Sequence, residues 1–171
     1  LLNTIGLIPP LIDFDSLMEA GKNQLYLETD YLAEAEFLAS FSRLVANLEV
    51  FEVPRVYRSL STSNILAMEF KEGITLDKAS SLTQCQKNDL IYNIMKLLFA
   101  EIFDFKLIQT DPNFSNFLYQ KKGNKIVLLD FGATQKITPN LSKKFRTLLR
   151  ATWRNDEVDI KTALTDLNIL D

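Results

Sequence analysis

The segment QTDPNFSNFLY, residues 109–119, places an aspartate and an asparagine five positions apart, Asp111 and Asn116. The apolar run IVLLD follows and leads into the triplet Asp-Phe-Gly that begins at Asp130. Carboxylate and amide oxygens suit a hard cation such as Mg²⁺, and a carboxylate can also accept a proton from a hydroxyl group or from water. These three side chains are therefore the first candidates for chemistry in this chain.

The backbone around Asp111 is predicted to form a loop. Pro112 fixes its own φ angle and disfavours helical angles at Asp111, so a helix is not expected to continue through it. A loop that curls between Asp111 and Asn116 brings both side chains to one point. An ordinary alternative stays open, in which Asp111 is a turn residue and Asn116 is a helix cap, since both residue types are common in such places.

Residues 117–129 are predicted to form a β-hairpin. Its strands are FLYQ and IVLL, and Gly123-Asn124 lies at the tip of the polar turn KKGNK. Because a hairpin returns the chain to its starting point, Asp130 is expected beside Asn116. Gly132 then allows backbone angles that a residue with a β-carbon resists.

This arrangement matches the parts of a phosphoryl-transfer site. In that chemistry a loop aspartate positions or deprotonates the acceptor, while a loop asparagine and the aspartate of Asp-Phe-Gly hold Mg²⁺ ions that bridge the phosphates. The Asp-x₄-Asn spacing alone is a weak signal, but a hairpin that joins it to Asp-Phe-Gly after a long amphipathic helix is far more specific. The pattern predicts ATP and Mg²⁺ as cofactors.

The composition excludes several other classes of site. The 171 residues include no histidine, which removes Ser-His-Asp and Cys-His nucleophile systems and the usual zinc sites. The one cysteine, Cys85, cannot form an internal disulfide and is expected to be an ordinary helix residue. The net charge of −3 gives no general attraction to nucleic acid, and no apolar run reaches the about 18 residues of a membrane span.

The N-terminal part is predicted to be helical and then to form a hairpin. Apolar residues recur at helical spacing from about residue 16 to residue 45, either in one helix or in two, of which the second starts at Asp30. The segment VPRVYRSLSTSNILAMEF is predicted to be a β-hairpin with strands at about 55–58 and 65–70.

The remaining elements are predicted from their caps. Thr83 and Gln86 have the spacing of a capping box, and the apolar stripe after them predicts a long helix that runs directly into QTDPNFSN. Thr138-Pro139 is a favourable start for a helical region over the last thirty residues. Trp153, in that region, is expected in the core. The absence of repeats and linkers favours a single domain.

The sequence resembles the UbiB family of atypical kinases, above all the eukaryotic mitochondrial branch needed for coenzyme Q (ubiquinone) biosynthesis. The segments that carry the likeness are ETDYLAEAEFLASF, VPRVYRSLSTSNILAMEFKEG, QTDPNFSNFLY and LLDFGAT, in the family's order. The resemblance implies an α+β, protein-kinase-like fold. The chain is then a fragment of a single atypical kinase-like domain, with a partial N-lobe at about 1–72 and a mainly helical C-lobe at 73–171.

The resemblance also implies catalytic roles. The family's loop lacks the His-Arg-Asp of ordinary kinases, and DPNFSN is similar to its eukaryotic form. Asp111 is implied to be the loop aspartate, and Asn116 and Asp130 are implied to be Mg²⁺ ligands. Glu34, in DYLAEAE, is implied to be the glutamate that pairs with the ATP-binding lysine.

Two further groups follow from the same resemblance. Glu28 and Asp30, in ETDY, look like the family's Glu-x-Asp element, which meets a Lys-x-Gly-Gln segment upstream. A solvated acidic helix face remains the ordinary alternative for these two residues. Met68, Glu69 and Phe70 are implied to form the hinge beside adenine, the last two through backbone groups.

The chain departs from the family at its N-terminal side. The Lys-x-Gly-Gln segment, the nucleotide-covering loop and the strand lysine are not found before Glu34, and Lys22, the one lysine upstream, is predicted to lie in a helix. We therefore expect a truncated domain that is inactive by itself because it lacks much of its phosphate clamp.

The activity implied by the resemblance is that of an atypical kinase or ATPase, at the mitochondrial inner membrane, which supports coenzyme Q synthesis. A nucleotide-gated scaffold, or pseudokinase, for other biosynthetic proteins is a second hypothesis. A small-molecule kinase of the aminoglycoside-phosphotransferase type is a third, since it shares the Asp-x₄-Asn spacing. The segments ETDY and AMEFKEG point away from the third hypothesis.

Basic residues recur at helical spacing near the C-terminal end: Lys143, Arg146, Arg150 and Arg154. One interpretation is peripheral contact with anionic lipid headgroups, in keeping with lipid precursors of coenzyme Q as partners. A plain amphipathic helix packed on its lobe is the favoured interpretation. The tyrosines do not form a stacking platform for bases, so no nucleic-acid partner is expected.

Overall fold

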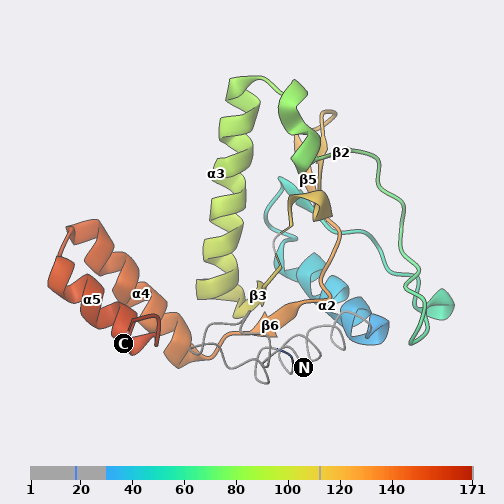
Figure 1. Cartoon of the computed structure of the whole chain (residues 1–171). Helices are drawn as coiled ribbons and strands as arrows, with labels where there is room; N and C mark the ends of the chain where they lie inside the picture. Colours follow the sequence, from blue (N-terminus) through green and yellow to red (C-terminus); the bar gives the residue numbers. More distant parts are fainter. Residues whose placement is uncertain (1–17, 19–29, 112, 171) are drawn as a thin grey trace, which may run out of the picture.

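The computed structural model describes residues 18, 30–111 and 113–170 (Figure 1). A four-stranded sheet has the strand order β1-β5-β4-β2, and β3 and β6 form a separate two-stranded sheet. Within the described residues, the bounds of the strands are Phe51–Glu52 for β1, Ile74–Thr75 for β2, Leu107–Gln109 for β3, Phe117–Gln120 for β4, Lys125–Leu128 for β5 and Thr134–Lys136 for β6.

The hairpin predicted over residues 117–129 is confirmed as β4 and β5, which pair antiparallel with Phe117 opposite Leu128. Gly123 and Asn124 both have positive φ, as the predicted turn tip requires. On the outer side of β5, β1 pairs in parallel. On the outer side of β4, β2 pairs antiparallel. The sheet therefore combines segments from both sides of the lobe boundary predicted near residue 72, and that boundary stays a prediction.

The helix α2, Tyr31–Leu44, begins as the sequence allowed, because the Asp30 carboxylate accepts a hydrogen bond from Ala33 N at 3.0 Å. The earlier part of the predicted helical region lies outside the described residues, except for Met18. Leu38 and Phe41, one turn apart, are fully buried on the inner face of α2.

The capping box before α3, Gln84–Ala100, is confirmed by reciprocal bonds between Thr83 and Gln86. The prediction that this helix runs directly into the catalytic-looking loop is wrong. A π-helical turn, Glu101–Phe105, follows α3, and Lys106 then adopts left-handed angles that end the helix. The strand β3 separates this turn from the loop and pairs with β6. The spacing of apolar residues within one segment cannot predict such a pairing, because the partner strand lies elsewhere in the sequence.

The hairpin with strands predicted at about 55–58 and 65–70 is only partly correct. The two segments do run antiparallel, but they pair through the isolated bridges Val56–Met68 and Thr62–Ile65 rather than through continuous strands. A short 3₁₀ turn over residues 58–60 begins at the last residue of the first predicted strand. The Glu69 carboxylate also accepts from Arg55 N at 3.2 Å, so a side chain takes a donor that a ladder would have used.

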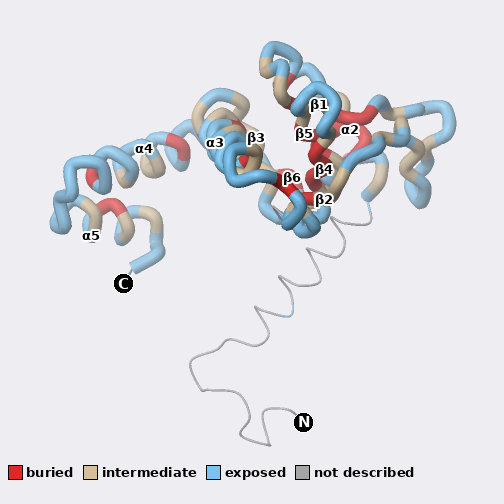
Figure 2. The backbone as a smooth tube through the Cα atoms, turned by 90° about the horizontal axis from the view of Figure 1, so that it is seen from above, coloured by how far each residue is buried: buried red, intermediate tan, exposed pale blue. Residues whose placement is uncertain are grey.

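The C-terminal helices α4, Pro139–Arg154, and α5, Glu157–Asp166, pack on each other away from the four-stranded sheet (Figures 1 and 2). The predicted cap is present, since Leu141 N donates to Thr138 Oγ1 at 3.1 Å. The expectation that Trp153 is a core residue is wrong, because it is 90% exposed. It lies near the end of α4, where it lines a shallow groove with arginines instead of facing the sheet.

The hydrophobic core joins α2 to the chain after β5, and Figure 2 shows the buried stretches of α2, β4 and β5 together. At its centre, the ring centroid of Phe41 lies 4.4 Å from that of Phe131 and 6.3 Å from that of Phe105. Phe131 belongs to the Asp-Phe-Gly triplet. The core therefore reaches directly to the candidate site.

Replacing Phe41 by Ala should lower the free energy of unfolding by about 3–5 kcal/mol, because it leaves a cavity against Phe131 and Phe105. Urea denaturation measures the change. Phe70→Ala is the matched control, since Phe70 is 84% exposed and should cost less than about 0.5 kcal/mol. Equal effects of the two substitutions would contradict the assigned core.

Candidate functional site

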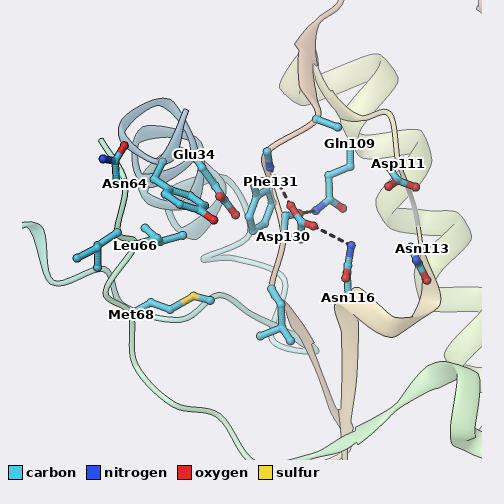
Figure 3. Close-up of a pocket in the computed structure, with 15 residues that line it drawn as sticks. Glu34, Asn64, Leu66, Met68, Gln109, Asp111, Asn113, Asn116, Asp130 and Phe131 are labelled. Atoms are coloured by element: carbon cyan, nitrogen blue, oxygen red, sulfur yellow. Dashed lines mark hydrogen bonds between the residues drawn. The ribbon is translucent and has the colours of Figure 1, made fainter. Parts of the chain in front are cut away.

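A cavity of about 690 Å³ lies between α2, the segment that contains Met68, and the loops on either side of the β4–β5 hairpin (Figure 3). The predicted site residues that line this cavity are Glu34, Met68, Asp111, Asn116 and Asp130. They come from four separate stretches of sequence. The fold therefore brings most of the candidate residues together.

Asp130 is held by hydrogen bonds to both of its carboxylate oxygens. Asn116 Nδ2 donates to Asp130 Oδ2 at 3.0 Å, which confirms that the hairpin places these two residues side by side (Figure 3). Gly132 N donates to Asp130 Oδ1 at 2.9 Å, so the Asp-Phe-Gly turn closes on its own first residue. Leu129 N also donates to Asn116 O at 3.0 Å, which joins the two loops through their backbones.

The loop that carries Asp111 curls as expected, and Asn113 organises it. Asn113 Oδ1 accepts from Ser115 N at 3.0 Å and from Ser115 Oγ at 2.9 Å. Asn113 N donates to Asp111 O at 2.9 Å, and a 3₁₀ turn over residues 114–116 carries Asn116 back toward Asp130. The sequence analysis did not single out Asn113, although an Asn two residues before a Ser is a common side-chain-capped turn.

The donor set at this wall of the cavity fits a hard cation. It offers the carboxylates of Asp111 and Asp130 and the amide oxygen of Asn116, which are oxygen ligands of the kind that Mg²⁺ takes. Among the described residues no group of three or more acidic, histidine or cysteine side chains is gathered for a metal. A cation here would therefore depend on Asn116 and on oxygens of a bound ligand to complete its shell.

Glu34 projects from the first turn of α2 toward Asp130 and Phe131 (Figure 3). It is only 8% exposed. Burial raises the pKa of the Glu34 carboxyl, and the negative charge of Asp130 raises it further, while a backbone hydrogen bond from Phe131 opposes both. No lysine or arginine is among the described residues that line the cavity, so the lysine expected to pair with Glu34 is not seen there.

The predicted hinge residues divide between two cavities. Met68 lines the main cavity, whereas Glu69 and Phe70 line a neighbouring one of about 570 Å³ that shares Met68 and Leu129 with it. Glu69 N already donates to Arg55 O at 2.8 Å, so this N–H group is engaged within the protein. Contact of Glu69 and Phe70 with adenine stays a prediction.

The acidic element predicted before α2 is seen only in part. Glu28 lies outside the described residues. Asp30 caps α2, which is a local role that accounts for its position. The family-motif role implied for the two residues stays a prediction.

Gln109 is a site residue that the sequence analysis missed. Its side-chain Nε2 donates to the backbone carbonyl of Asp130 at 2.5 Å, and the residue lines the cavity at the end of β3 (Figure 3). The next residue, Thr110, donates to Ala133 O through N at 3.1 Å and through Oγ1 at 2.6 Å. The sequence signal for Gln109 is its position as the first residue of QTDPNFSN.

Replacing Glu34 by Gln should make stability less dependent on pH. Because the folded-state pKa of Glu34 lies above the ordinary value of 4.5, wild-type stability falls as pH rises from there through the folded-state pKa, and a glutamine lacks this loss. The variant should therefore gain stability relative to wild type toward neutral pH. Urea unfolding between about pH 4 and pH 7.5 measures the trend.

Glu36, on the same helix, supplies the matched control with the opposite sign. Its hydrogen bond and ion pair with Arg58, at 2.6 Å, lower the pKa of the Glu36 carboxyl. Glu36 therefore contributes stability above pH 4.5 that is lost as pH falls, and Glu36→Gln should lose stability relative to wild type toward neutral pH. Trends of the same sign in the two variants would contradict this account of Glu34.

None of the helices in the described ranges combines the length and the apolar character that a membrane span requires.

The basic helix predicted near the C-terminal end is confirmed as α4, and its arginines flank exposed apolar groups. Arg146 lies 4.9 Å above the ring centroid of Phe103. A groove at this place is lined by Phe103, Arg146, Leu149, Arg150, Trp153 and Arg154.

Comparison with known proteins identifies the family. The description "ABC1 atypical kinase-like domain" matches residues 1–164. "Atypical kinase COQ8, mitochondrial" from Saccharomyces cerevisiae is 39% identical over 149 residues, which cover 87% of this chain and 30% of that protein. "Atypical kinase COQ8B, mitochondrial" from Danio rerio is 34% identical over 163 residues, which cover 95% of this chain and 26% of that protein.

A solved structure supports the same fold. The complex of Rv3197 with erythromycin from Mycobacterium tuberculosis has a TM-score of 0.65 and 20% sequence identity, and the match covers 95% of this chain and 41% of that one. The chain spans about a quarter to a third of the length of the curated relatives above. The predicted resemblance to mitochondrial atypical kinases is confirmed, and the chain belongs to the ABC1 atypical kinase-like family, with a kinase-like α+β fold.

Proposed function

We propose that the cavity binds ATP with Mg²⁺ and supports phosphoryl chemistry. The single observation that carries this proposal is the hydrogen-bonded pair of Asn116 and Asp130 on the same cavity wall as Asp111. Mg²⁺ would be held by oxygens of Asn116 and Asp130, and it would neutralise charge on the phosphates. Asp111, exposed on its loop, would orient or deprotonate the attacking hydroxyl group or water.

From the two adjoining cavities we infer where the base and the phosphates of ATP would lie. Met68 and Leu129 lie where the main cavity meets the neighbouring one, and their apolar side chains suit the faces of an adenine ring. Asp111, Asn116 and Asp130 line the main cavity only. Adenine would then lie between Met68 and Leu129, with Glu69 and Phe70 at its outer edge.

For the biological role, we propose that the whole protein is a mitochondrial atypical kinase or ATPase that supports coenzyme Q biosynthesis. The support is its similarity to relatives named as mitochondrial COQ8 atypical kinases, of which this chain matches only a part. Lipid precursors of coenzyme Q, other biosynthetic proteins and the inner membrane are proposed partners. The exposed Trp153 and the arginines of α4 suit peripheral contact with anionic lipid.

A scaffold role is the second candidate, and one observation favours it. Glu34 faces Asp130 across the cavity without a cationic side chain among the described lining residues. Unless a cation from outside the described residues completes it, such a site would bind nucleotide and transfer phosphate weakly, as expected of a nucleotide-gated scaffold. The presence of Asp111, Asn116 and Asp130 together favours catalysis in the whole protein.

Replacing Asp130 by Asn should weaken Mg²⁺-dependent ATP binding by at least about tenfold, since loss of a ligand should cost no less than loss of an outer-shell partner. The measurement is nucleotide binding as a function of Mg²⁺ concentration in the full-length protein. Asp104→Asn, an exposed substitution outside the cavity, is the control and should have no effect. Unchanged Mg²⁺ dependence in Asp130→Asn would refute the metal assignment.

Replacing Asp111 by Asn should leave ATP affinity within about twofold of wild type but lower ATP turnover by about 100-fold or more, because the amide cannot act as a base. ATP hydrolysis by the full-length protein measures the rate. Complementation of a coenzyme Q-deficient strain by the same variant separates the two candidate functions. Full complementation without turnover would support the scaffold and exclude the enzyme.

A further inference from the structure

Glu101 is a buried carboxyl group that the proposed chemistry does not use. It is the first residue of the π-helical turn after α3 and is only 3% exposed. Burial raises the pKa of this carboxyl to about 8. π-Helical turns often occur at functional sites, and an isolated buried carboxyl is costly to keep in a core.

A chain of hydrogen bonds joins Glu101 to the candidate metal site. Gln109 N donates to Glu101 Oε2 at 3.3 Å. The side chain of Gln109 then donates to the backbone carbonyl of Asp130 at 2.5 Å. Gln109 is therefore held by Glu101 through its backbone N–H, and its side chain in turn holds the Asp130 carbonyl.

The pairing of β3 with β6 explains why a side chain is needed here. Gln109 lies opposite Thr134, the last paired position of β3. Thr134 N donates to Phe131 O at 3.1 Å, and Gln109 N donates to Glu101. Neither the Gln109 N–H group nor the Thr134 N–H group therefore donates to the opposite strand. Glu101 thus supplies the acceptor for a Gln109 N–H group that has none on β6.

Unpaired buried polar atoms are also concentrated around Gln109. Within the described part of the chain, the buried side-chain atoms found without a hydrogen-bond partner are Glu101 Oε1 and Thr134 Oγ1. One belongs to the residue that accepts from Gln109, and the other belongs to its cross-strand neighbour. Stability alone would favour apolar side chains at such positions.

We propose that Glu101 is a positioning residue for the metal site, because its carboxyl holds the Gln109 backbone in the place from which the Gln109 amide fixes the Asp130 carbonyl. The predicted effect on Mg²⁺ binding rests on the proposed function, whereas the predicted effect on the Asp-Phe-Gly turn that begins at Asp130 does not. With Gln109 held, the Asp130 peptide has one orientation, and the carboxylate meets Asn116 Nδ2 and Gly132 N as observed.

The test compares Glu101→Met, Glu101→Gln and the control Tyr119→Phe in the full-length protein. Methionine has a similar length but removes the acceptor for Gln109 N. Glutamine keeps an acceptor oxygen and resembles the protonated carboxyl, which the raised pKa makes the main form at neutral pH. Tyr119→Phe removes a part-buried hydrogen bond to Asn124 Oδ1 (2.6 Å) from a residue that does not line the cavity.

The first readout is amide hydrogen exchange over residues 130–134, without nucleotide. Glu101→Met should raise exchange in this segment by about tenfold, because Asp130 and Gly132 lose their support. Glu101→Gln and Tyr119→Phe should stay within about twofold of wild type. The proposal is overturned if Glu101→Met leaves exchange in this segment unchanged, or if Tyr119→Phe raises it equally.

The second readout is the Mg²⁺ midpoint of ATP binding. Glu101→Met should raise this midpoint by about tenfold, as expected when an outer-shell partner of a metal site is lost, and Glu101→Gln should restore it. Loss of folded protein alone would lower the binding amplitude and leave the midpoint unmoved. A midpoint raised equally in both Glu101 variants would overturn the role of the acceptor oxygen.

The two readouts separate this inference from the proposed function. If the wild-type protein binds no ATP with Mg²⁺, the proposed function fails, while hydrogen exchange still decides whether Glu101 supports the Asp130 turn. If the wild type binds ATP with Mg²⁺ and Glu101→Met changes neither readout, the inference fails alone.

Discussion

The contact between Phe131 and Phe41 is the constraint on which the site depends. Phe131 is 1% exposed and packs on a fully buried ring of α2, while its neighbour Asp130 is exposed to the cavity. Because adjacent residues are held in opposite environments, the backbone between them has little freedom. The same contact connects α2 to the Asp-Phe-Gly turn and so sets where Glu34 lies relative to Asp130.

The side chains that line the cavity carry negative charge. The carboxylates of Glu34, Asp111 and Asp130 line one cavity, and no described lining residue is cationic. The pKa of the Glu34 carboxyl is raised by burial and then by the negative charge of Asp130, so Glu34 and Asp130 repel each other in the protein alone. The Mg²⁺ ion of the proposed function would relieve this repulsion.

Sequence reasoning succeeded where the determinants are local. The Asp30 cap, the Thr83–Gln86 capping box and the β4–β5 turn each depend on residues a few positions apart. It failed at β3 and at the interrupted pairing of Val56 with Met68, because those depend on partners distant in sequence or on a competing side chain. Trp153 was misplaced because hydrophobicity alone does not say which face of α4 meets other elements.

The sequence by itself determined the family, through its segments, and it placed Asp130 beside Asn116, since the hairpin between them returns the chain through local geometry. Only the tertiary structure decided which other residues join the site. Glu34 reaches Asp130 through the packing of α2, and Gln109, at the end of β3, links Glu101 to the Asp130 carbonyl through two hydrogen bonds. Such contacts arise from the packing of separate elements, which periodicity and capping within one element cannot specify.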